Sequence, residues 1–399
     1  MISVSDAQSR ILSEITQVTP PELIPVAHSL GRVLAVDVRA PFDVPPSDNS
    51  AVDGYAVSSQ DIPKEGLQAL RVIGDLPAGS VFDRVVQRGE TIRIMTGAPL
   101  PKGVDSVLPQ ELVKSSGDEV LVPPIDSGLN VRYQGEDVKR DAVVLQEGFP
   151  IRPQEMGLLT SLGIAQLLVR QKPRVAILST GNEVAEPGKL RSPGQIYDAN
   201  RFTLTGLVHA MACEAIDFGI IPDVRDRLKE RLLEAAQAAD IVITSGGVSV
   251  GVYDLVKDIL TEIGGIDFWQ VAMQPGRPMA HGRIGPAHFF GLPGNPVASM
   301  LTFFLFVRPA LWKLMGRKEL SPQRFTAATT EAMKKKKGRQ EFKRGILTFR
   351  DQEWRVQTTG PQGSGILTSM VLANCFIILE EDRGDVDAGE TVWVEPFQF

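Results

Sequence analysis

The stretch TSGGVSVG at residues 244–251 follows an apolar run, residues 240–244, that is typical of a buried strand. Two further glycine-rich corners, STGNE at 179–183 and GLPGNP at 291–296, also come directly after apolar runs. In a doubly wound sheet such corners lie at the carboxyl ends of parallel strands, which is the edge where ligands usually bind. The three corners therefore predict an α/β domain that binds a small molecule, and we expect that molecule to carry phosphate.

The segments around these corners alternate between predicted strands and predicted helices. Strands are expected at 174–178, 215–220, 240–244 and near Phe289, and helices at 200–212, 227–238, 253–263 and 297–314. This alternation is typical of βαβ units in a parallel sheet. Because Lys172 and Pro173 make a clean boundary before the first strand, we assign residues 172–320 to the α/β domain.

The rest of the chain predicts three further regions. Apolar residues recur at helical spacing over 5–18 and again over 154–168, on either side of a region of short Val, Ile and Leu alternations broken by Gly, Pro and Asp. We expect residues 1–40 and 145–171 to form one discontinuous helical linker domain, and residues 41–144 to form a β domain. Residues 321–399 predict a small β-barrel or β-sandwich. The expected fold class is thus multidomain, with α/β and all-β parts.

Composition excludes several classes of function. The 399-residue chain has a formal net charge of −6, whereas a general nucleic-acid binder usually has a basic domain. We therefore expect no nucleic-acid partner. The two cysteines, Cys213 and Cys375, are far apart and form no C-x-x-C pair, which argues against a thiolate zinc site.

No targeting or membrane segment is expected. The start of the chain lacks the basic residues and the apolar core of a secretory signal. The longest apolar stretch, near 300–307, is interrupted by Arg308 and Pro309 and is far shorter than the ~20 residues that span a bilayer. These features predict a cytoplasmic protein.

A basic run at 334–337, followed by Arg339, is either a solvated loop or a phosphate-attracting patch.

Acidic residues at the corners suggest a metal. Glycines 246 and 247 let the backbone turn and present N–H groups to an anion. Asp254 follows, and beside a phosphate pocket it would hold Mg²⁺ or contact a ribose or pterin; its other reading is a helix N-cap. Glu183 and Asp223 stand at neighbouring corners, so the three acids could form a site for a hard cation. Asn295 can cap a helix that begins at Pro296, directing the helix dipole toward the crevice.

Several familiar motifs are absent from the sequence. It has no G-x-G-x-x-G after a strand and no G-x-x-x-x-G-K-[ST], which disfavours a Rossmann dehydrogenase and a P-loop ATPase. The four histidines show no paired metal-ligand spacing. Ser245 and Ser249 do not lie in a G-x-S-x-G elbow, which disfavours nucleophilic hydrolysis.

Five motifs together resemble those of a known family. They are NSAVDGYA at 49–56, TGA at 96–98, STGNE at 179–183, SGGVSVG at 245–251 and LPGNP at 292–296. In this order and spacing they closely resemble the molybdopterin molybdotransferase family of the MoeA type, which includes the gephyrin E domain. The resemblance runs from about residue 5 to residue 396.

The resemblance implies a fold and a reaction. It implies a homodimer whose subunits have a helical linker domain, a β domain, a molybdopterin-binding α/β domain and a C-terminal β-barrel, the β domain of one subunit completing the cleft of the other. The implied reaction inserts molybdate into adenylylated molybdopterin, with Mg²⁺-dependent cleavage of the adenylate and release of AMP. Because the chain has a single α/β unit, the molybdopterin adenylyltransferase must be a separate upstream enzyme.

The resemblance also assigns roles to residues of this chain. The positions that match the family's catalytic acids and hydroxyl are Asp53, Thr96, Glu183, Asp223 and Asp254, and Glu183, Asp223 and Asp254 are the expected metal ligands. The expected cofactor-binding residues are Ser245, Gly246, Gly247, Ser249, Gly251, Pro275, Gly276, Arg277, Pro293, Gly294, Asn295, Pro296, Arg344 and Ser364.

One departure from the family pattern leaves alternatives open. Gln270 and Gln274 stand where many members have lysine. Arg277, Arg283 or the basic run at 334–337 would then supply the missing positive charge. Tungstate in place of molybdate remains an alternative, because the two oxyanions have nearly the same size and charge. A non-catalytic dimeric scaffold or molybdopterin carrier is a second alternative, and a related enzyme that hydrolyses a nucleotide pyrophosphate is a third.

Overall fold

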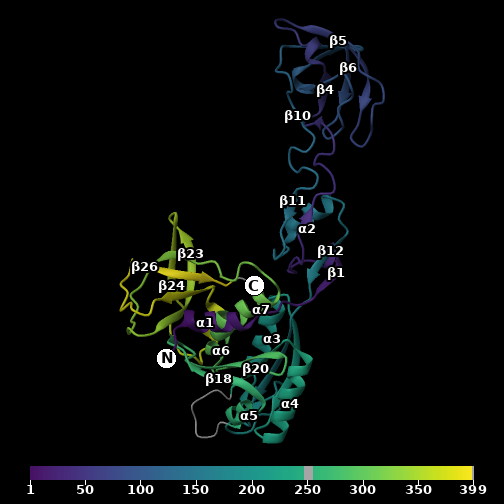
Figure 1. Cartoon of the computed structure of the whole chain (residues 1–399). Coiled ribbons are helices and arrows are strands. Elements are labelled where there is room, and N and C mark those ends of the chain that lie inside the picture. Colours follow the sequence, from purple (N-terminus) through teal and green to yellow (C-terminus); the bar gives the residue numbers. More distant parts are fainter. Residues whose placement is uncertain (247–254, 398–399) are drawn as a thin grey trace. The chain divides into compact units, whose positions relative to one another are not determined.

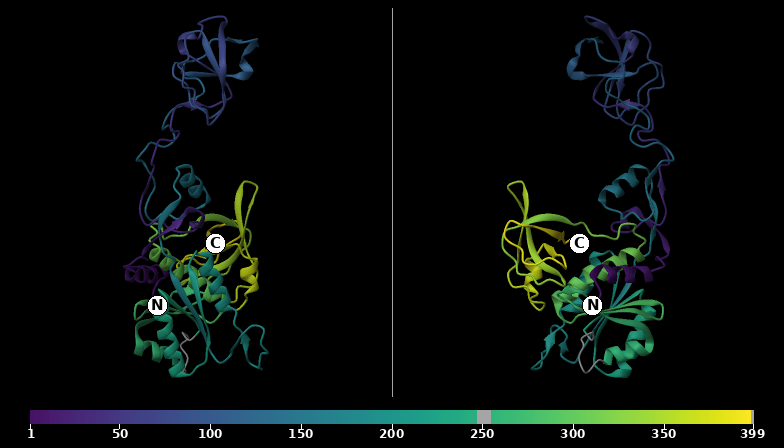
Figure 2. Two further views of the ribbon diagram at one scale, coloured as in Figure 1. Left: turned by 90° about the vertical axis from the view of Figure 1, so that its right-hand side faces the viewer. Right: turned by 60° about the vertical axis from the view of Figure 1, so that its left-hand side comes forward.

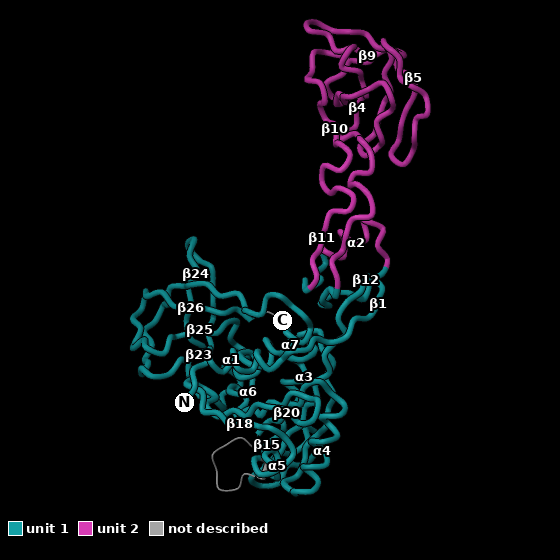
Figure 3. The backbone as a smooth tube through the Cα atoms, in the orientation of Figure 1, with its two compact units in different colours: residues 1–35, 148–153, 166–399 teal, residues 36–147, 154–165 magenta. Residues whose placement is uncertain are grey.

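The computed structural model describes residues 1–246 and 255–397, which fall into two compact units (Figures 1 and 3). The first unit contains Met1–Ala35, Gly148–Pro153 and Gln166–Phe399, and the second contains Val36–Glu147 and Gln154–Ala165. The multidomain fold class with α/β and β parts is confirmed, because the first unit holds both an α/β sheet and a closed barrel and the second is built mainly of strands.

A six-stranded sheet forms the centre of the first unit. Its order is β16-β13-β17-β21-β20-β18, in which the first four strands pair in parallel and β20 pairs antiparallel with both β21 and β18. The strands are β13 (Arg174–Thr180), β16 (Glu214–Ile221), β17 (Ile241–Ser245), β18 (Gly264–Gln270), β20 (Pro278–Ile284) and β21 (Ala287–Leu292). The parallel part agrees with the sequence prediction. Strands β18 and β20 were not predicted, because their residues do not show the continuous apolar run of a buried parallel strand.

Helices cover both faces of this sheet, which makes it doubly wound (Figure 2). On β13, Val175 and Ile177 pack with helices α3 (Asn200–Ala210) and α6 (Pro296–Thr302). The alternate residues Ala176 and Leu178 pack with α4 (Arg225–Ala238) and, in the same cluster, α5 (Leu255–Ile263). A strand with both faces buried must be apolar at every position, which explains the runs seen in the sequence.

A long apolar helix closes this sheet. It continues from α6 through a π-type turn, Phe303–Val307, into α7 (Arg308–Leu314). The expectation that no apolar segment approaches the length of a membrane span was wrong, since Pro296–Leu314 has 19 residues and a mean hydropathy of 1.4. However, 89% of this window is buried inside the protein, and its phenylalanines belong to the main core. Packing therefore accounts for its apolar character.

The C-terminal strands close into a barrel. Their ring runs β23-β24-β22-β26-β25 and returns to β23. The elements are β22 (Phe325–Thr329), β23 (Gln340–Arg350), β24 (Glu353–Thr358), α8 (Thr368–Leu372), β25 (Cys375–Leu379) and β26 (Thr391–Pro396). The short strand β19 (Met273–Gln274) pairs in parallel with β23 and so joins the loop after β18 to the barrel.

The N-terminal helix and the segment near residue 160 differ from prediction. Helix α1 spans Val4–Glu14, with Ser3 as N-cap accepting from the Asp6 amide, and ends four residues before the predicted end. Helix α2 ends at Ser161 (Pro153–Ser161), so the predicted helix over 154–168 was too long. Gly163 adopts a φ of +69°, which ends the helix, and β12 (Gln166–Arg170) follows, pairing with β1 (Pro21–Pro25).

The second unit contains another six-stranded sheet, in the order β7-β4-β6-β5-β9-β8. Its strands are β4 (Gly54–Val57), β5 (Gln68–Leu76), β6 (Glu90–Ile94), β7 (Ser106–Pro109), β8 (Lys114–Ser116) and β9 (Glu119–Val122). The remaining short elements of the chain are η1 (Val26–His28), β2 (Val38–Arg39), β3 (Asn49–Ser50), η2 (Ser59–Asp61), η3 (Gln110–Leu112), β10 (Val131–Arg132), β11 (Val143–Leu145), β14 (Val184–Ala185) and β15 (Ile196–Tyr197).

Candidate active site

The site lies where the strand order of the α/β sheet reverses. Strand β13 is followed in sequence by β16 on one side and then by β17 on the other, and ligands bind outside the carboxyl ends of strands at such a switch point. Gly246 directly follows β17 with a φ of +92°, and its N–H donates to the Leu292 carbonyl at 3.0 Å. Gly294 lies against it, since a Cβ there would be 3.8 Å from the Gly246 Cα. Two of the predicted corners therefore meet.

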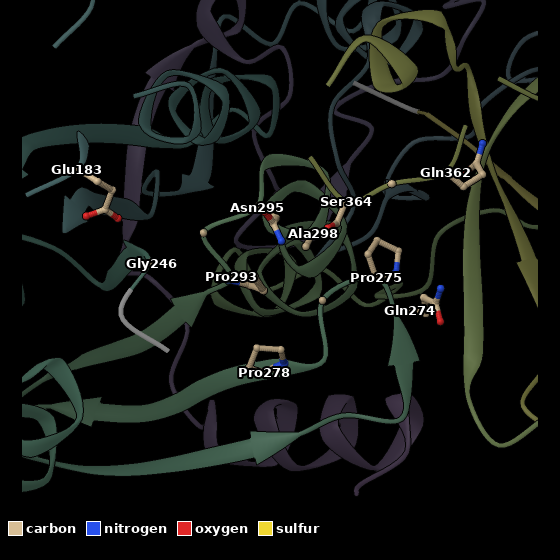
Figure 4. Close-up of a pocket in the computed structure, with 13 residues that line it drawn as sticks. Glu183, Gly246, Gln274, Pro275, Pro278, Pro293, Asn295, Ala298, Gln362 and Ser364 are labelled. Atoms are coloured by element: carbon tan, nitrogen blue, oxygen red, sulfur yellow. The ribbon is translucent and has the colours of Figure 1, made fainter. Parts of the chain in front are cut away.

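A cavity of about 510 Å³ opens beside these corners (Figure 4). Its volume is in the usual range for a small-molecule site. In Figure 4, Glu183 and Gly246 lie on one side, and Gln274, Pro275 and Gln362 on the other. The lining residues are Glu183, Gly246, Gln274, Pro275, Gly276, Pro278, Pro293, Gly294, Asn295, Ala298, Gln362, Gly363 and Ser364. The cavity thus has walls from both the α/β sheet and the barrel, and it gathers most of the described cofactor-binding candidates.

A smaller cavity of about 120 Å³ shares Glu183, Gly246 and Gly294 with the first. Two more predicted residues, Ser245 and Pro296, line it. Thr180, Asp198 and Asn200, which the sequence analysis did not single out, also line it. Because the two cavities share residues, they form two parts of one crevice.

Asn200 holds two of the corners together. Its side-chain Nδ2 donates to the Ser245 hydroxyl at 2.7 Å and to the Gly294 carbonyl at 2.7 Å. Below it Asp198, which is 4% exposed, accepts from the Ser179 hydroxyl at 3.0 Å and pairs with Arg201 at 2.9 Å. The signal that could have identified Asn200 is its place at the start of a helix directly after a strand corner, where asparagine is a common cap.

Arg201 anchors this side of the crevice from beneath. Its guanidinium is buried and pairs with Asp198, Glu186 and Asp217. Burial alone would lower the pKa of Arg201, but the hydrogen bonds with Asp198 and Glu186 and the negative charges of Asp217 and Asp198 together outweigh it, so the pKa lies above its ordinary value. The pairing compensates the buried charge and fixes the position of the helix that begins at Asn200.

Glu183 and Asp223 lie against the same peptide unit. The Asp223 carboxylate accepts from the Asn182 N–H at 3.3 Å, and the Asn182 side chain accepts from the Asp223 N–H at 3.3 Å. The Glu183 carboxylate folds back over Gly181, where a Cβ would come within 2.4 Å of Oε2. Gly181 is therefore required for this arrangement, both by this approach and by its φ of +130°. Both acids are exposed at the sheet edge.

The described residues fit part of the expected Mg²⁺ site. Within residues 1–246 and 255–397, no group of three acidic, histidine or cysteine side chains is placed to hold a metal ion. However, Mg²⁺ is commonly bound through one or two carboxylates together with substrate phosphates and water. Glu183 and Asp223 meet that requirement in type and number. The predicted third ligand, Asp254, and the candidates Gly247, Ser249 and Gly251 lie outside the described residues.

The loop after β18 packs tightly against α6. Gly276 has a φ of +87°, and a Cβ on it would lie 3.0 Å from the Thr302 hydroxyl. Gln274 lines the larger cavity, whereas Gln270 does not, and Arg277 is exposed outside that lining. Of the two glutamines that replace the lysines common in the resembled family, Gln274 is thus the one that bears on the site.

Asn295 occupies the N-cap position of α6 as predicted, but its side chain makes no capping hydrogen bond with any described residue. It lines the cavity instead (Figure 4). Pro296 is the first residue of the helix and has no N–H to satisfy. The amide of Asn295 is therefore available to a ligand.

Arg344 lies behind the cavity wall and does not line it. Its Nε donates to the Ser369 hydroxyl and its Nη2 to the Gly363 carbonyl, both at 3.0 Å. Burial lowers the pKa of Arg344 to about 10. Ser364, in contrast, lines the cavity, and its carbonyl accepts from the Val297 N–H at 3.1 Å. Arg344 thus holds the 362–364 loop, and Ser364 faces the crevice.

Asp53 and Thr96 form a pair in the second unit. Asp53 Oδ1 accepts from both the backbone N–H and the hydroxyl of Thr96, each at 2.8 Å. The backbone hydrogen bond from Thr96, with the hydroxyl second, holds the pKa of Asp53 below its usual value. Both side chains are exposed on their unit, so the pair presents an ionised carboxylate to solvent.

The basic run at 334–337 is partly neutralised by neighbours. Lys334 pairs with Asp385 at 2.8 Å. Lys335 is buried and donates to the Arg383 carbonyl at 2.8 Å, and Lys343 pairs with Glu341 at 3.0 Å. None of these lysines lines the larger cavity. These contacts favour the structural reading of the run over the phosphate-attracting one.

Comparison with known proteins gives matches along the whole chain. Three family descriptions match: "MoeA N-terminal region (domain I and II)" at residues 2–163, "Probable molybdopterin binding domain" at 176–313 and "MoeA C-terminal region (domain IV)" at 326–397. The molybdopterin molybdenumtransferase of Haemophilus influenzae is 41% identical over 100% of this chain and 99% of its own length. Molybdopterin molybdenumtransferase 2 of Mycobacterium tuberculosis is 35% identical over 99% of both chains.

The fold is also similar to that of a solved structure. A molybdopterin biosynthesis moeA protein from Pyrococcus horikoshii OT3 is similar with a TM-score of 0.87 and 33% identity, with both chains fully covered. The fold and the switch-point crevice define an α/β binding domain with an attached barrel, and the named relatives are transferases. The chain belongs to the molybdopterin molybdenumtransferase family.

Proposed function

We propose that this protein inserts molybdate into adenylylated molybdopterin and releases AMP, with Mg²⁺ assisting cleavage of the adenylate. At the coarser level it is a transferase of molybdenum cofactor biosynthesis, as its family membership establishes. The observation that carries the finer proposal is the divided crevice at the switch point, where a large cavity and a small one share Glu183, Gly246 and Gly294. Such a crevice suits a ligand with two chemically distinct parts, such as a pterin joined to a nucleotide.

The polar groups of the crevice suit an anion that is held by dipoles. Of the described residues that line the larger cavity, Glu183 alone carries a charge. The donors there are amide side chains, namely Gln274, Asn295 and Gln362, with the Ser364 hydroxyl and glycine N–H groups. Fixed dipoles of this kind stabilise developing negative charge without reorganising during the reaction. These residues are suited to positioning the reacting groups, and the proposal needs no covalent nucleophile.

Glu183 and Asp223 are the described residues that would hold Mg²⁺. When bound, the cation would act as a Lewis acid on a phosphoanhydride oxygen. The two carboxylates are themselves held by the Gly181–Asn182 peptide. They thus present oxygen ligands at the edge of the crevice, next to the Gly246 corner that would take phosphate oxygens.

The same proposal includes a homodimer in the cytoplasm that receives adenylylated molybdopterin from a separate adenylyltransferase. Asp53 and Thr96 support it, because they form a pre-oriented carboxylate on a unit other than the one that contains the crevice. A carboxylate so ordered and yet exposed is suited to completing a site on a second subunit. Crosslinking and sedimentation of the purified chain would measure the oligomeric state directly.

The test is AMP release from adenylylated molybdopterin by the purified protein. We expect release to need both Mg²⁺ and molybdate, with tungstate as a parallel arm that measures oxyanion preference. Glu183→Gln should reduce release at least tenfold. Glu214→Gln, an exposed acid at the start of β16, is the matched control and should have no effect.

Three results would contradict the proposal. Release without any oxyanion would indicate a pyrophosphate hydrolase. Tight binding of the adenylylated compound with no release under any condition would indicate a carrier or scaffold. Unchanged AMP release by the Glu183→Gln variant would show that the Glu183 carboxylate takes no part in the reaction.

A further inference from the structure

A third cavity, of about 410 Å³, lies in the first unit. Its lining shares no residue with the two parts of the crevice. The walls are formed by residues 31–33, 150–152, 210–212 and 312–323. Val33, Ile151, Met211, Trp312 and Met315 make these walls largely apolar. The volume is again in the range of small-molecule sites.

The charged side chains in this lining are Arg152, Arg317 and Glu319. Arg152 stacks on the Phe149 ring at 5.4 Å, and Arg317 is the cation that lies beside the apolar wall. Its guanidinium carbon lies 4.3 Å from the centroid of the Trp312 ring, a geometry that fixes the guanidinium over the indole. Arg308 contacts the same ring at 5.0 Å. The two arginines differ in their partners, because Arg308 pairs with the buried carboxylate of Glu395 at 2.6 Å.

Arg317 has no such partner among the described residues. No carboxylate of that part of the chain forms an ion pair with it within 4.0 Å, and its Nε is buried without a hydrogen-bond acceptor. Burial and the nearby charge of Arg308 lower the pKa of Arg317, and the charge of Glu319, which also lines the cavity, acts against them. Arg317 as a whole is half-buried, but its Nε is a buried donor without an acceptor, and such a donor is costly. An anion bound in the cavity would offset that cost.

We propose that this cavity binds a small organic anion with a planar apolar body, of the class of an aromatic monocarboxylate. The carboxylate pairs with Arg317, whose planar fork matches carboxylate geometry. The ring packs between Trp312 and the thioethers of Met211 and Met315, a contact that methionine sulfur favours. A fully hydrated inorganic oxyanion would leave the apolar walls unfilled, which is why the structure favours an organic one.

The experiment is calorimetric titration of the full chain with 2-naphthoate. We expect one saturable site per chain. The uncharged 2-naphthamide should bind at least tenfold more weakly, and inorganic phosphate should not saturate over the same concentration range. Arg317→Met keeps a long side chain on Trp312 and removes the charge, so it should weaken naphthoate binding at least tenfold. Lys318→Gln, an exposed neighbour outside the lining, removes one positive charge nearby and should leave the affinity unchanged.

A second variant keeps the test independent of folding defects in Arg317→Met. Met211→Trp fills the cavity without changing its charge and should abolish naphthoate binding. Equal affinity for the acid and the amide, unchanged binding in both variants, or no saturable binding at millimolar naphthoate would each overturn the proposal. AMP release measured on the same samples should be unaffected by Arg317→Met, since Arg317 lines neither part of the crevice.

Discussion

The side-chain amide of Asn200 lies between Ser245 and Gly294 and donates a 2.7 Å hydrogen bond to each. One side chain at the start of α3 thereby sets the spacing between the corner after β17 and the corner after β21. The floor of the crevice depends on this spacing, because Gly246 and Gly294 belong to both of its parts.

We expect Asn200→Ala to lower the free energy of unfolding by about 1–3 kcal/mol, since it leaves the buried Ser245 hydroxyl without its donor. AMP release should fall more than this loss of stability explains, because both corners lose their fixed spacing. Urea unfolding and steady-state kinetics measure the two effects separately. Thr205→Ala, on the same helix and outside both cavities, is the control. A variant that is destabilised but fully active would show that Asn200 is only structural.

Gly181→Ala should displace the Glu183 carboxylate, because the added Cβ would lie 2.4 Å from Oε2. We expect Mg²⁺-dependent AMP release to fall at least tenfold. Gly188→Ala is a matched control: its φ of +87° imposes similar backbone strain, but a Cβ there meets nothing within 4 Å. If Gly181→Ala and Gly188→Ala released AMP at the same rate, the position of the Glu183 carboxylate would not be what limits the reaction.

Thr96→Val should raise the pKa of Asp53, since it removes the hydroxyl that donates to Oδ1 and leaves the backbone donor in place. The folded-state pKa of Asp53 lies below its ordinary value, so the stabilisation from this pair is present above the unfolded pKa and is lost as pH falls through the folded one. In the variant this stabilisation should be smaller, and its loss should be complete at a higher pH. An NMR titration of the Asp53 carboxyl measures the shift, and an unchanged midpoint would contradict the role given to the hydroxyl.

Acid should destabilise the α/β sheet through two buried histidines. Burial lowers the pKa of His281 to about 3 and of His288 to about 4. The charge of His288 adds to the shift of His281, and the charge of Arg283 adds to that of His288. Because these values lie below the unfolded value, stability is complete above about pH 6.5 and falls as the pH drops toward 4. Glu14, which faces His281, has a raised pKa and acts in the opposite direction.

The check is the urea midpoint at pH 7.5 and pH 5. His281→Phe, which extends the existing contacts with Trp269 and Phe290, should reduce the difference between the two midpoints. The exposed His209 at the end of α3 provides the control in His209→Asn. A pH dependence that is equal in all three proteins would assign the acid sensitivity to other groups.

The sequence was informative where burial imposes a simple pattern. Strand β13 is buried on both faces, so its continuous apolar run predicted it, and the corner that follows was predicted with it. Strands β18 and β20 were missed because polar residues such as Asp267 and Arg283 interrupt their pattern. The helix predicted over 154–168 was too long. The spacing of apolar residues such as Leu167 and Val169 fits a helix as well as a strand, and the pairing with β1 decides that this segment is a strand.

The site was predictable at the corners and much less so between them. Glycine and proline at the corners identify the turns, the acidic residue after one corner pointed to Glu183, and the family resemblance added Ser364. Gln362 and Ala298 reach the crevice through tertiary packing, which no local pattern records. For Asn200 the one local signal was its place at the start of a helix. Arg344 is the opposite case. The family resemblance identified it as a binding residue, but its guanidinium donates hydrogen bonds to Ser369 and Gly363 behind the cavity wall.

The parallel pairing of Met273 with Gln340 and of Gln274 with Glu341 ties the loop after β18 to the barrel. Gln274 on that loop and Ser364 beyond the barrel's first strands face the same cavity. The binding site therefore cannot form from the α/β sheet alone. A shortened chain that kept the sheet but ended before Phe325 would lose the cavity wall that the barrel provides and would leave β19 without its neighbouring strand. Gene fusions or rearrangements that preserve this activity would have to carry the sheet and the barrel together.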